Sequence, residues 1–148
     1  MEYKAAMIIR LASVNDAAAI AGIALSLGYK MEAQQSLTEN ALGYLLDAQY
    51  DRVWVAELNG TVIGWLHAQH AFRMASVDFI EILGLSVSEQ SRFQGAGRAL
   101  VERVKAWASE EHVSLRVRTN DIRYDAKKFY SALGFSLVKT QSVFQISF

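Results

Sequence analysis

The sequence predicts an α/β protein, and three observations support that prediction. Apolar runs of strand length alternate with longer segments in which apolar residues recur at helical spacing. Asn59-Gly60, a pair that favours a two-residue hairpin turn, joins two of the strand-length runs. Residues 81–107 pass from an apolar run through a glycine loop into an amphipathic stretch, which indicates strand, loop and helix in succession.

The composition favours one cytoplasmic domain over residues 1–148. A chain of this length can bury most of its apolar surface around one core. Fifteen basic and fifteen acidic residues give zero formal net charge, so no overall field favours nucleic acid or an anionic membrane. The absence of cysteine excludes disulfides and thiolate metal sites. The apolar run before Arg10 is too short for a signal peptide or a spanning helix.

The first third of the chain is predicted to hold one strand and two helices. Residues 7–11 form the strand, and Ser13-Val14-Asn15-Asp16 resembles a capping box that opens a helix through Leu27. Residues 36–39 indicate a second cap, which precedes a short helix that ends near Tyr50.

A hairpin and a further strand are predicted next. Residues 52–58 and 61–67 are the two runs that flank the Asn59-Gly60 turn. Residues 72–76 form a turn, and the strand after it covers residues 77–87.

The last third is predicted to hold two helices and three strands. The first helix follows the glycine loop and buries the stripe Leu100, Val101, Val104, Trp107 and Ala108. Residues 113–118 alternate as a strand, and residues 125–133 form a helix that Gly134 ends. Residues 135–139 and 142–146 give two closing strands.

The loop at residues 92–97 has the composition of an anion site. Gly95 and Gly97 stand at the start of a helix, where backbone N–H groups lack partners and the helix dipole is positive. Arg92 and Arg98 flank the glycines, so a phosphate or pyrophosphate is the expected ligand. A dinucleotide fingerprint needs glycine where Leu100 stands, and a P-loop needs a Gly-Lys pair that is missing. A plain strand-to-helix turn remains the alternative.

Two blocks of this sequence resemble the GNAT superfamily of N-acetyltransferases. Arg92-x-x-Gly95-x-Gly97 matches the Arg/Gln-x-x-Gly-x-Gly/Ala signature of the loop that holds the pyrophosphate of acetyl-CoA. Residues 120–135 resemble the second block, Asn-x-x-Arg/Asn-x-x-Ala-x-x-Phe-Tyr-x-x-x-Gly-Phe. The resemblance covers residues 77–137. It implies the GNAT fold, in which a mixed, mainly antiparallel central sheet is flanked by helices.

The resemblance also implies that acetyl-CoA is the co-substrate and that no metal is needed. Coenzyme contacts are expected from Leu85, Val87, Arg92, Phe93, Gln94, Gly95, Ala96, Gly97, Arg98, Asn120, Arg123 and Tyr130. Leu85 and Val87 would act through their backbone, because a bulge in the family's strand frees main-chain groups to pair with pantetheine, and Gly84 suits such a bulge. Phe93 departs from the family pattern, in which a glycine often stands there.

Acetyl transfer to an amine needs a base and an acid. Glu81 lies fourteen positions before Gly95, the spacing of the strand glutamate that serves as base in some GNAT members. Its apolar sequence neighbours would raise the pKa of its carboxyl towards a useful value. The alternative role for Glu81 is an edge-facing charge or an ion-pair partner, and Asp78 is the reserve base.

Tyr130 occupies the position at which many GNAT enzymes place the general acid. Its phenol keeps its proton at neutral pH and can give it to a leaving thiolate. Alternatively, Tyr130 is a core residue of its helix. His67 and His70 are either base or acceptor contacts, or histidines that only pack at the surface.

These features predict an N-acetyltransferase that moves the acetyl group of acetyl-CoA to a primary amine by direct attack in a ternary complex. The acceptor is open, a small molecule or a peptide or protein amine, and residues 28–50 and 67–78 are expected to contact it. No nucleic acid or membrane partner is expected, and a homodimer is compatible with the sequence. The alternative is a non-catalytic acyl-CoA-binding regulatory module, which would need the loop but neither Glu81 nor Tyr130.

Overall fold

The structure of the protein is a computed structural model that describes residues 6–26, 31–92, 95–120 and 122–148. The chain divides into two compact units, Met1–Val117 and Arg118–Phe148, and each is described by itself. That residues 1–148 form one domain stays a prediction.

The first unit is built on a mixed sheet of five strands in the order β1-β2-β3-β4-β5. The strands are β1 (Met7–Leu11), β2 (Asp51–Leu58), β3 (Thr61–Ala71), β4 (Phe79–Val87) and β5 (Ser114–Val117). The first four pair in antiparallel fashion, and β5 runs parallel to β4. All five strands were predicted, but β3 extends four residues beyond its expected end at His67, which places His70 inside the strand.

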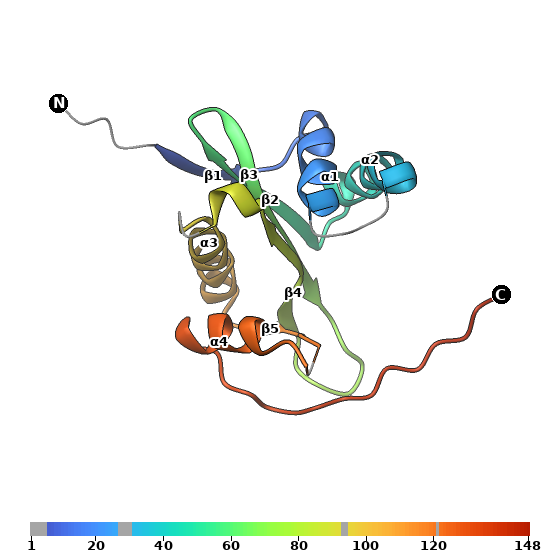
Figure 1. Ribbon diagram of the computed structural model, residues 1–148. Coiled ribbons are helices and arrows are strands. Elements are labelled where there is room, and N and C mark those ends of the chain that lie inside the picture. The colour runs from blue at the N-terminus through green and yellow to red at the C-terminus, as the bar shows by residue number, and fades with distance from the viewer. Residues whose placement is uncertain (1–5, 27–30, 93–94, 121) are drawn as a thin grey trace. The chain divides into compact units, whose positions relative to one another are not determined.

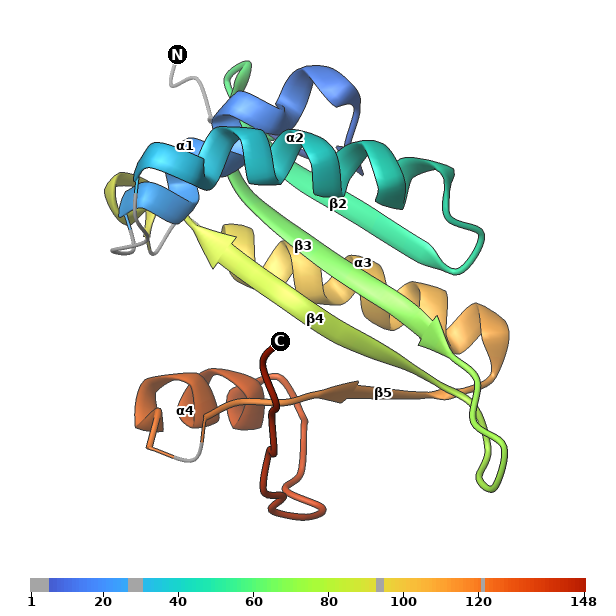
Figure 2. The same cartoon turned by 90° about the vertical axis from the view of Figure 1, so that its right-hand side faces the viewer.

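Helices cover both faces of this sheet (Figures 1 and 2). One face carries α1 (Ala17–Ser26) and α2 (Met31–Asp47), and the other carries α3 (Ala96–Glu111). The predicted cap at residues 36–39 is wrong, because α2 begins upstream and Ser36 lies inside it. Met, Glu, Ala and Gln are strong helix formers, so the segment before Ser36 continues the helix. The expected helix end at Leu27 falls outside the described residues.

The core under α3 contains several almost completely buried side chains. Trp54, Leu66, Ile80, Leu100 and Val104 are each no more than 1% exposed. All five residues of the predicted α3 stripe are buried, which confirms that prediction. The opposite face packs a second apolar cluster against α1 and α2, consisting of Ala12, Ala17, Ile20, Leu42, Val53 and Val55.

The β2–β3 hairpin closes as its turn sequence predicts. Asn59 and Gly60 both have positive φ, +51° and +81°, the pair of values that a type I′ turn requires. A bulge between Ala56 and Glu57 then shifts the pairing register of the remaining residues. That shift decides which side chains meet at the far end of the hairpin.

A partly buried ion pair holds the start of α1 against β1. The guanidinium of Arg10 donates to the carboxylate of Asp16 over 2.8 and 2.9 Å, and to Glu57 over 3.2 Å. Asp16 also accepts the backbone N–H of Ser13 at 2.7 Å, so the predicted capping box is confirmed, on a 3-10 turn, Val14–Asp16, that leads into α1. The hydrogen bond from Arg10 lowers the pKa of Asp16.

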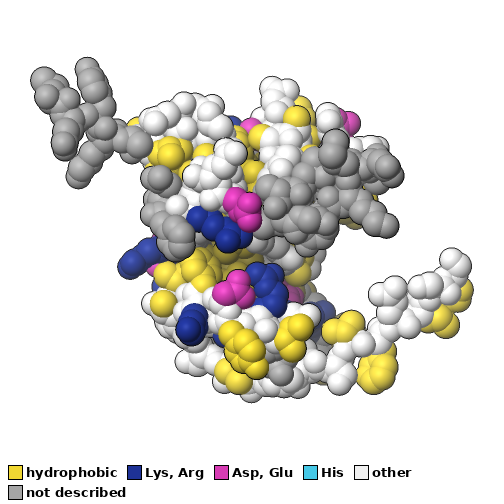
Figure 3. Space-filling view, in the orientation of Figure 1, with side chains coloured by type: hydrophobic (Ala, Val, Ile, Leu, Met, Phe, Trp, Pro, Cys, Tyr) yellow, Lys and Arg dark blue, Asp and Glu magenta, His cyan; other side chains and the backbone are white. Residues whose placement is uncertain are grey.

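The second unit holds α4 (Tyr124–Ala132) and an extended C-terminal segment. Gly134 follows α4 with φ +96°, the left-handed conformation expected of a helix-ending glycine. The predicted closing strands at 135–139 and 142–146 are wrong, because the structure describes no strand there. Alternating apolar and polar residues favour a strand, but a strand is stable only where another strand pairs with it. Figure 3 shows hydrophobic side chains exposed along this segment.

Candidate active site

The two edges of β4 differ, and the difference defines a site. β3 pairs with β4 along its whole length, whereas β5 pairs only with Phe79–Ile82. Among the described residues, the edge of β4 from Leu83 to Val87 that faces away from β3 therefore has no strand partner. Leu85 and Val87, the two residues expected to act through their backbone, lie on this open edge.

A bulge interrupts β4 where the open edge begins. His67 pairs with Gly84 and Ala68 pairs with Ile82, so Leu83 is the extra residue. A bulge near Gly84 was predicted and is confirmed. The indole of Trp65 explains the glycine, because a Cβ on Gly84 would lie 2.7 Å from its ring carbons.

Glu81 lies in a row of polar residues that crosses three strands. In register, Asp51 of β2 faces Gln69 of β3, and Gln69 faces Glu81 of β4. Residues directly opposite each other point to the same face of a sheet. The row therefore lies on the face that α1 and α2 cover. Glu81 is only 4% exposed, which puts a carboxylate in a place largely closed to water.

A hydrogen bond connects Asp51 of this row to His67. His67 Nε2 lies 2.7 Å from Asp51 Oδ1, and the Gln69 amide donates to both carboxylate oxygens of Asp51 at 3.3 Å. A carboxylate only accepts hydrogen bonds, so Nε2 carries the proton when the ring is neutral and Nδ1 carries the lone pair.

His70 and Asp78 form a separate pair. His70 Nε2 lies 2.6 Å from Asp78 Oδ2, and its ring stacks on Phe72 at 4.4 Å. His70 alternates with Gln69 along β3, and its ring meets Trp107 of α3, so it faces away from Glu81. The hydrogen bond from His70 lowers the pKa of Asp78, which makes this reserve base weaker.

A 3-10 turn, Glu89–Ser91, connects β4 to the glycine loop, which ends at α3. Gly95 is the N-cap of α3 with φ +84°, and no atom of the described residues lies within 4 Å of the place where its side chain would be. Backbone conformation rather than space therefore favours glycine there. Ala96, Gly97 and Arg98 form the first turn of the helix. Phe93 and Gln94 lie outside the described residues.

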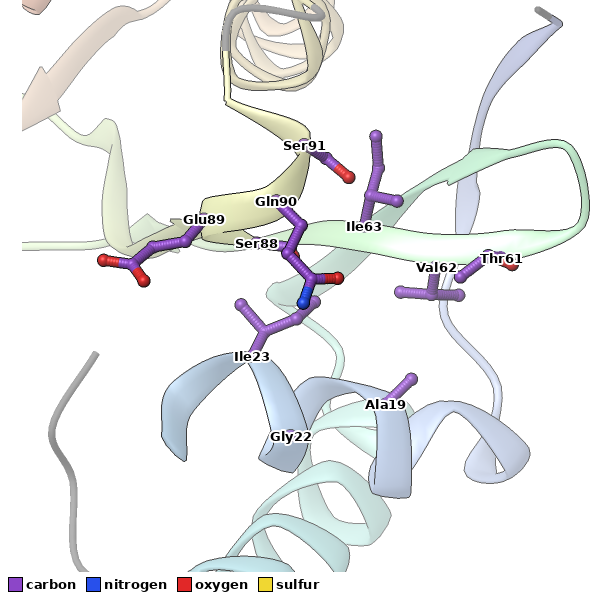
Figure 4. A pocket seen from close by; sticks show the side chains of 10 residues that line it. All are labelled: Ala19, Gly22, Ile23, Thr61, Val62, Ile63, Ser88, Glu89, Gln90 and Ser91. Atoms are coloured by element: carbon purple, nitrogen blue, oxygen red, sulfur yellow. The ribbon is translucent and has the colours of Figure 1, made fainter. Parts of the chain in front are cut away.

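A cavity of about 450 Å³ adjoins the segment that leads into the loop (Figure 4). Its walls come from α1, the start of β3 and the residues Ser88, Glu89, Gln90 and Ser91. Figure 4 shows Gln90 and Ile23 extending into the space between helix and strand, with Glu89 turned away. Among the described residues that line this cavity, no side chain that could act as a base points into it, because Glu89 is turned away. We therefore place the candidate chemistry at the Glu81 row instead.

The second unit contains the other predicted site residues. The Asn120 side chain accepts the backbone N–H of Ile122 at 3.3 Å, which orders the turn before α4, and Arg123 is the N-cap. Tyr130 packs edge-on against Phe129 and Phe135, with ring centroids 5.0 and 5.4 Å away. Burial raises the pKa of Tyr130 to about 12.

Comparison with known proteins fits this arrangement of strand, bulge and loop. A family model described as the acetyltransferase (GNAT) family matches residues 17–135. The chain belongs to this family. No curated protein matches it significantly in sequence.

Solved structures share the GNAT fold at low sequence identity. An aminoglycoside N-acetyltransferase, AAC(6')-Iy, solved in complex with CoA, is 20% identical with a TM-score of 0.80, over 99% of this chain and 98% of that chain. The AAC(6')-IG enzyme of Acinetobacter haemolyticus is 16% identical with a TM-score of 0.81, over 95% and 99%. A structure described as a transcriptional regulator from Bacillus halodurans is 19% identical with a TM-score of 0.80, over 95% and 100%. These matches confirm the predicted fold class.

Neither a cluster of metal ligands nor a membrane-spanning helix is found among the described residues of this chain. Within the described residues, no group of three or more histidine, aspartate or glutamate side chains is placed to hold a metal ion. No helix in that part of the chain is long and apolar enough to cross a membrane.

The sequence indicated Glu81 but missed Asp51 and Gln69. In an unbroken hairpin closed by Asn59-Gly60, Asp51 would face Ala68. The bulge between Ala56 and Glu57 moves the partner by one residue, to Gln69. Gly64, which pairs with Ala56 at this bulge, was the available signal, because an isolated glycine inside a strand often marks a bulge.

Proposed function

We propose that the chain is an N-acetyltransferase that moves the acetyl group of acetyl-CoA to a primary amine. The observation that carries the proposal is β4, which combines buried Glu81, an open edge at Leu85 and Val87, and a connection to the glycine loop through one short turn. Family membership supports acyl transfer, and a structural neighbour solved with CoA supports the choice of coenzyme.

The loop is proposed to bind the pyrophosphate. The first turn of α3 supplies N–H groups without helical partners, and Arg92 and Arg98, both exposed, add positive charge beside them. The open edge of β4 then offers main-chain groups to pantetheine as an added strand. Phe93, Gln94, Ala96, Asn120 and Arg123 remain proposed coenzyme contacts.

Glu81 is the proposed base. It takes a proton from the acceptor ammonium, directly or through water, and leaves a nitrogen lone pair. That nitrogen attacks the thioester carbonyl carbon and a C–N bond forms. The C–S bond then breaks as the thiolate departs, and the nitrogen gives its second proton to water to leave the neutral amide. Burial among apolar neighbours keeps the Glu81 carboxylate away from competing water.

Tyr130 is the proposed acid that protonates the departing thiolate. With its pKa at about 12, the phenol is fully protonated at neutral pH but is a weaker acid than a thiol of pKa about 8.5. The proton transfer is therefore uphill, so the proposed contribution of Tyr130 to the rate is modest. The cytoplasmic location and a homodimer also remain proposals.

A matched pair of Gly95 variants tests coenzyme binding. Asparagine and aspartate have the same shape and both tolerate left-handed φ, but aspartate adds a negative charge where the pyrophosphate is proposed to bind. Calorimetry should show that Gly95→Asp loses acetyl-CoA binding and that Gly95→Asn weakens it far less. Equal affinity in wild type and folded Gly95→Asp would refute the loop assignment.

Turnover is tested by following thiol release from acetyl-CoA across a panel of primary amines. Amine-dependent release supports the transferase. Tight acetyl-CoA binding without release for any amine would instead favour the non-catalytic acyl-CoA-binding module.

A further inference from the structure

An apolar groove lies between α2 and the sheet, on the same face as Glu81. It encloses about 190 Å³ and is lined by Ile20, Leu37, Thr38, Ala41, Leu42, Leu45, Val53, Trp65 and His67. Seven of these nine side chains are aliphatic or aromatic, so the groove favours an apolar occupant.

The polar end of the groove is at His67, next to a carboxylate that does not itself line the groove. His67 lines the groove and is hydrogen-bonded to Asp51, whose side chain is only 9% exposed. Asp51 lies in the same cross-strand row as Glu81, with Gln69 between them. His67 also pairs with Gly84 at the bulge, where the open edge of β4 begins. The polar end of the groove therefore adjoins the place proposed for the reacting thioester.

We propose that this groove binds the body of the acceptor, and that the acceptor is a primary amine on a single aromatic ring or a short branched alkyl chain. The apolar body packs between α2 and Trp65, while the amine lies beside His67, on the side towards β4 and Glu81. This inference rests on the proposed function and names the substrate class of the same site.

The volume of the groove and the carboxylate beside His67 both favour an amine of this class. An engineered cavity of about 150 Å³ is known to hold benzene, so about 190 Å³ accommodates one ring but not a multi-ring sugar. The carboxylate of Asp51, which is hydrogen-bonded to the lining residue His67, complements one ammonium group. Further ammonium groups would lie against Leu42, Leu45 or Val53, where burying an unpaired charge is strongly unfavourable.

Three amines separate the possibilities in both binding and turnover. The amines are 2-phenylethylamine, methylamine and the polycationic aminoglycoside kanamycin. With CoA present, calorimetry should detect binding of 2-phenylethylamine in preference to the other two. Its kcat/KM should exceed that of methylamine by about tenfold to hundredfold, the gain expected from burying one ring.

Two neighbouring residues of α2 provide the matched variants. Ala41 lines the groove and Asn40 does not, and both are exposed, so both positions tolerate a large side chain. Ala41→Trp should fill the groove and remove most of the preference for 2-phenylethylamine, while Asn40→Trp should keep it. Leu37→Glu, at a groove residue that is 61% exposed, gives a second test should Ala41→Trp fail to fold.

The outcomes distinguish this inference from the proposed function. Binding of 2-phenylethylamine that Ala41→Trp or Leu37→Glu abolishes supports the groove, even where no acetyl transfer follows. Acetyl transfer to kanamycin or methylamine that equals or exceeds transfer to 2-phenylethylamine would overturn the groove while leaving the transferase intact. Absence of 2-phenylethylamine binding in the folded wild type would also overturn it.

Discussion

Ile80 and Glu81 are neighbours in β4, and both are almost completely buried, at 0% and 4% exposure. Ile80 pairs with His70 and belongs to the face covered by α3, where Trp54 and Leu66 pack. Glu81 belongs to the opposite face, where Gln69 stands beside it. Equal burial therefore has different content: the α3 face buries apolar side chains at this point, whereas the opposite face buries the carboxylate proposed as the base.

The largest expected effect is a loss of folding free energy caused by a substitution on the α3 face of the sheet. Ile80→Ala removes fully buried methyl and methylene groups and leaves a cavity in a close-packed core. The free energy of unfolding should fall by about 2–5 kcal/mol, measured by denaturant titration. At a temperature where the variant stays folded, its kcat should remain near the wild-type value. A large loss of kcat in the folded variant would show that packing on the α3 face also affects catalysis on the Glu81 face.

Glu81→Gln should have the opposite pattern. The shape of the side chain is kept and the proton acceptor is lost, so kcat should fall by about a hundredfold or more. The midpoint of denaturant unfolding should stay close to that of the wild type. The acidic limb of the pH–rate profile should also disappear, and a limb unchanged in the variant would assign the base to another group or to water.

Asp16→Asn tests how α1 is held on the Glu81 side. Losing the charge-assisted bonds from Arg10 should lower the free energy of unfolding near pH 7 by about 1–3 kcal/mol. Because the pKa of Asp16 is lower in the folded state, its stabilisation is full above its ordinary pKa of about 3.9 and is lost as pH falls through the folded value. The difference between wild type and variant should therefore shrink below about pH 4, as urea unfolding at several pH values would reveal.

Tyr130→Phe should give the smallest effect, and it asks whether the second unit contributes chemistry. The substitution keeps the contacts with Phe129 and Phe135 and removes the hydroxyl. Since the phenol is a weak acid at a pKa of about 12, kcat should fall by only about tenfold, with acetyl-CoA affinity nearly unchanged. Wild-type turnover with chemistry limiting would leave Tyr130 as a packing residue.

Local sequence determined which elements form over most of the chain and fixed some of their ends. Asn59-Gly60 set the hairpin turn, since few other pairs adopt positive φ twice in succession. The apolar stripe of α3 set which face of that helix is buried, because helical spacing fixes which side chains share a side. Glu81 was predicted as the base from a resemblance, because its distance to Gly95 matches that of the strand glutamate in some GNAT members, and this role stays a prediction.

Tertiary structure decided what meets across the strands. The bulge between Ala56 and Glu57 brought Asp51 opposite Gln69, and the length of β3 carried His70 to Asp78. Ser36 lies inside α2 because a helix once formed continues through a favourable cap residue. The alternating residues 135–146 remained outside any strand. In the strand cases the deciding partner lies in another segment, and a strand acquires its register or its existence only from the backbone groups that this segment presents to it.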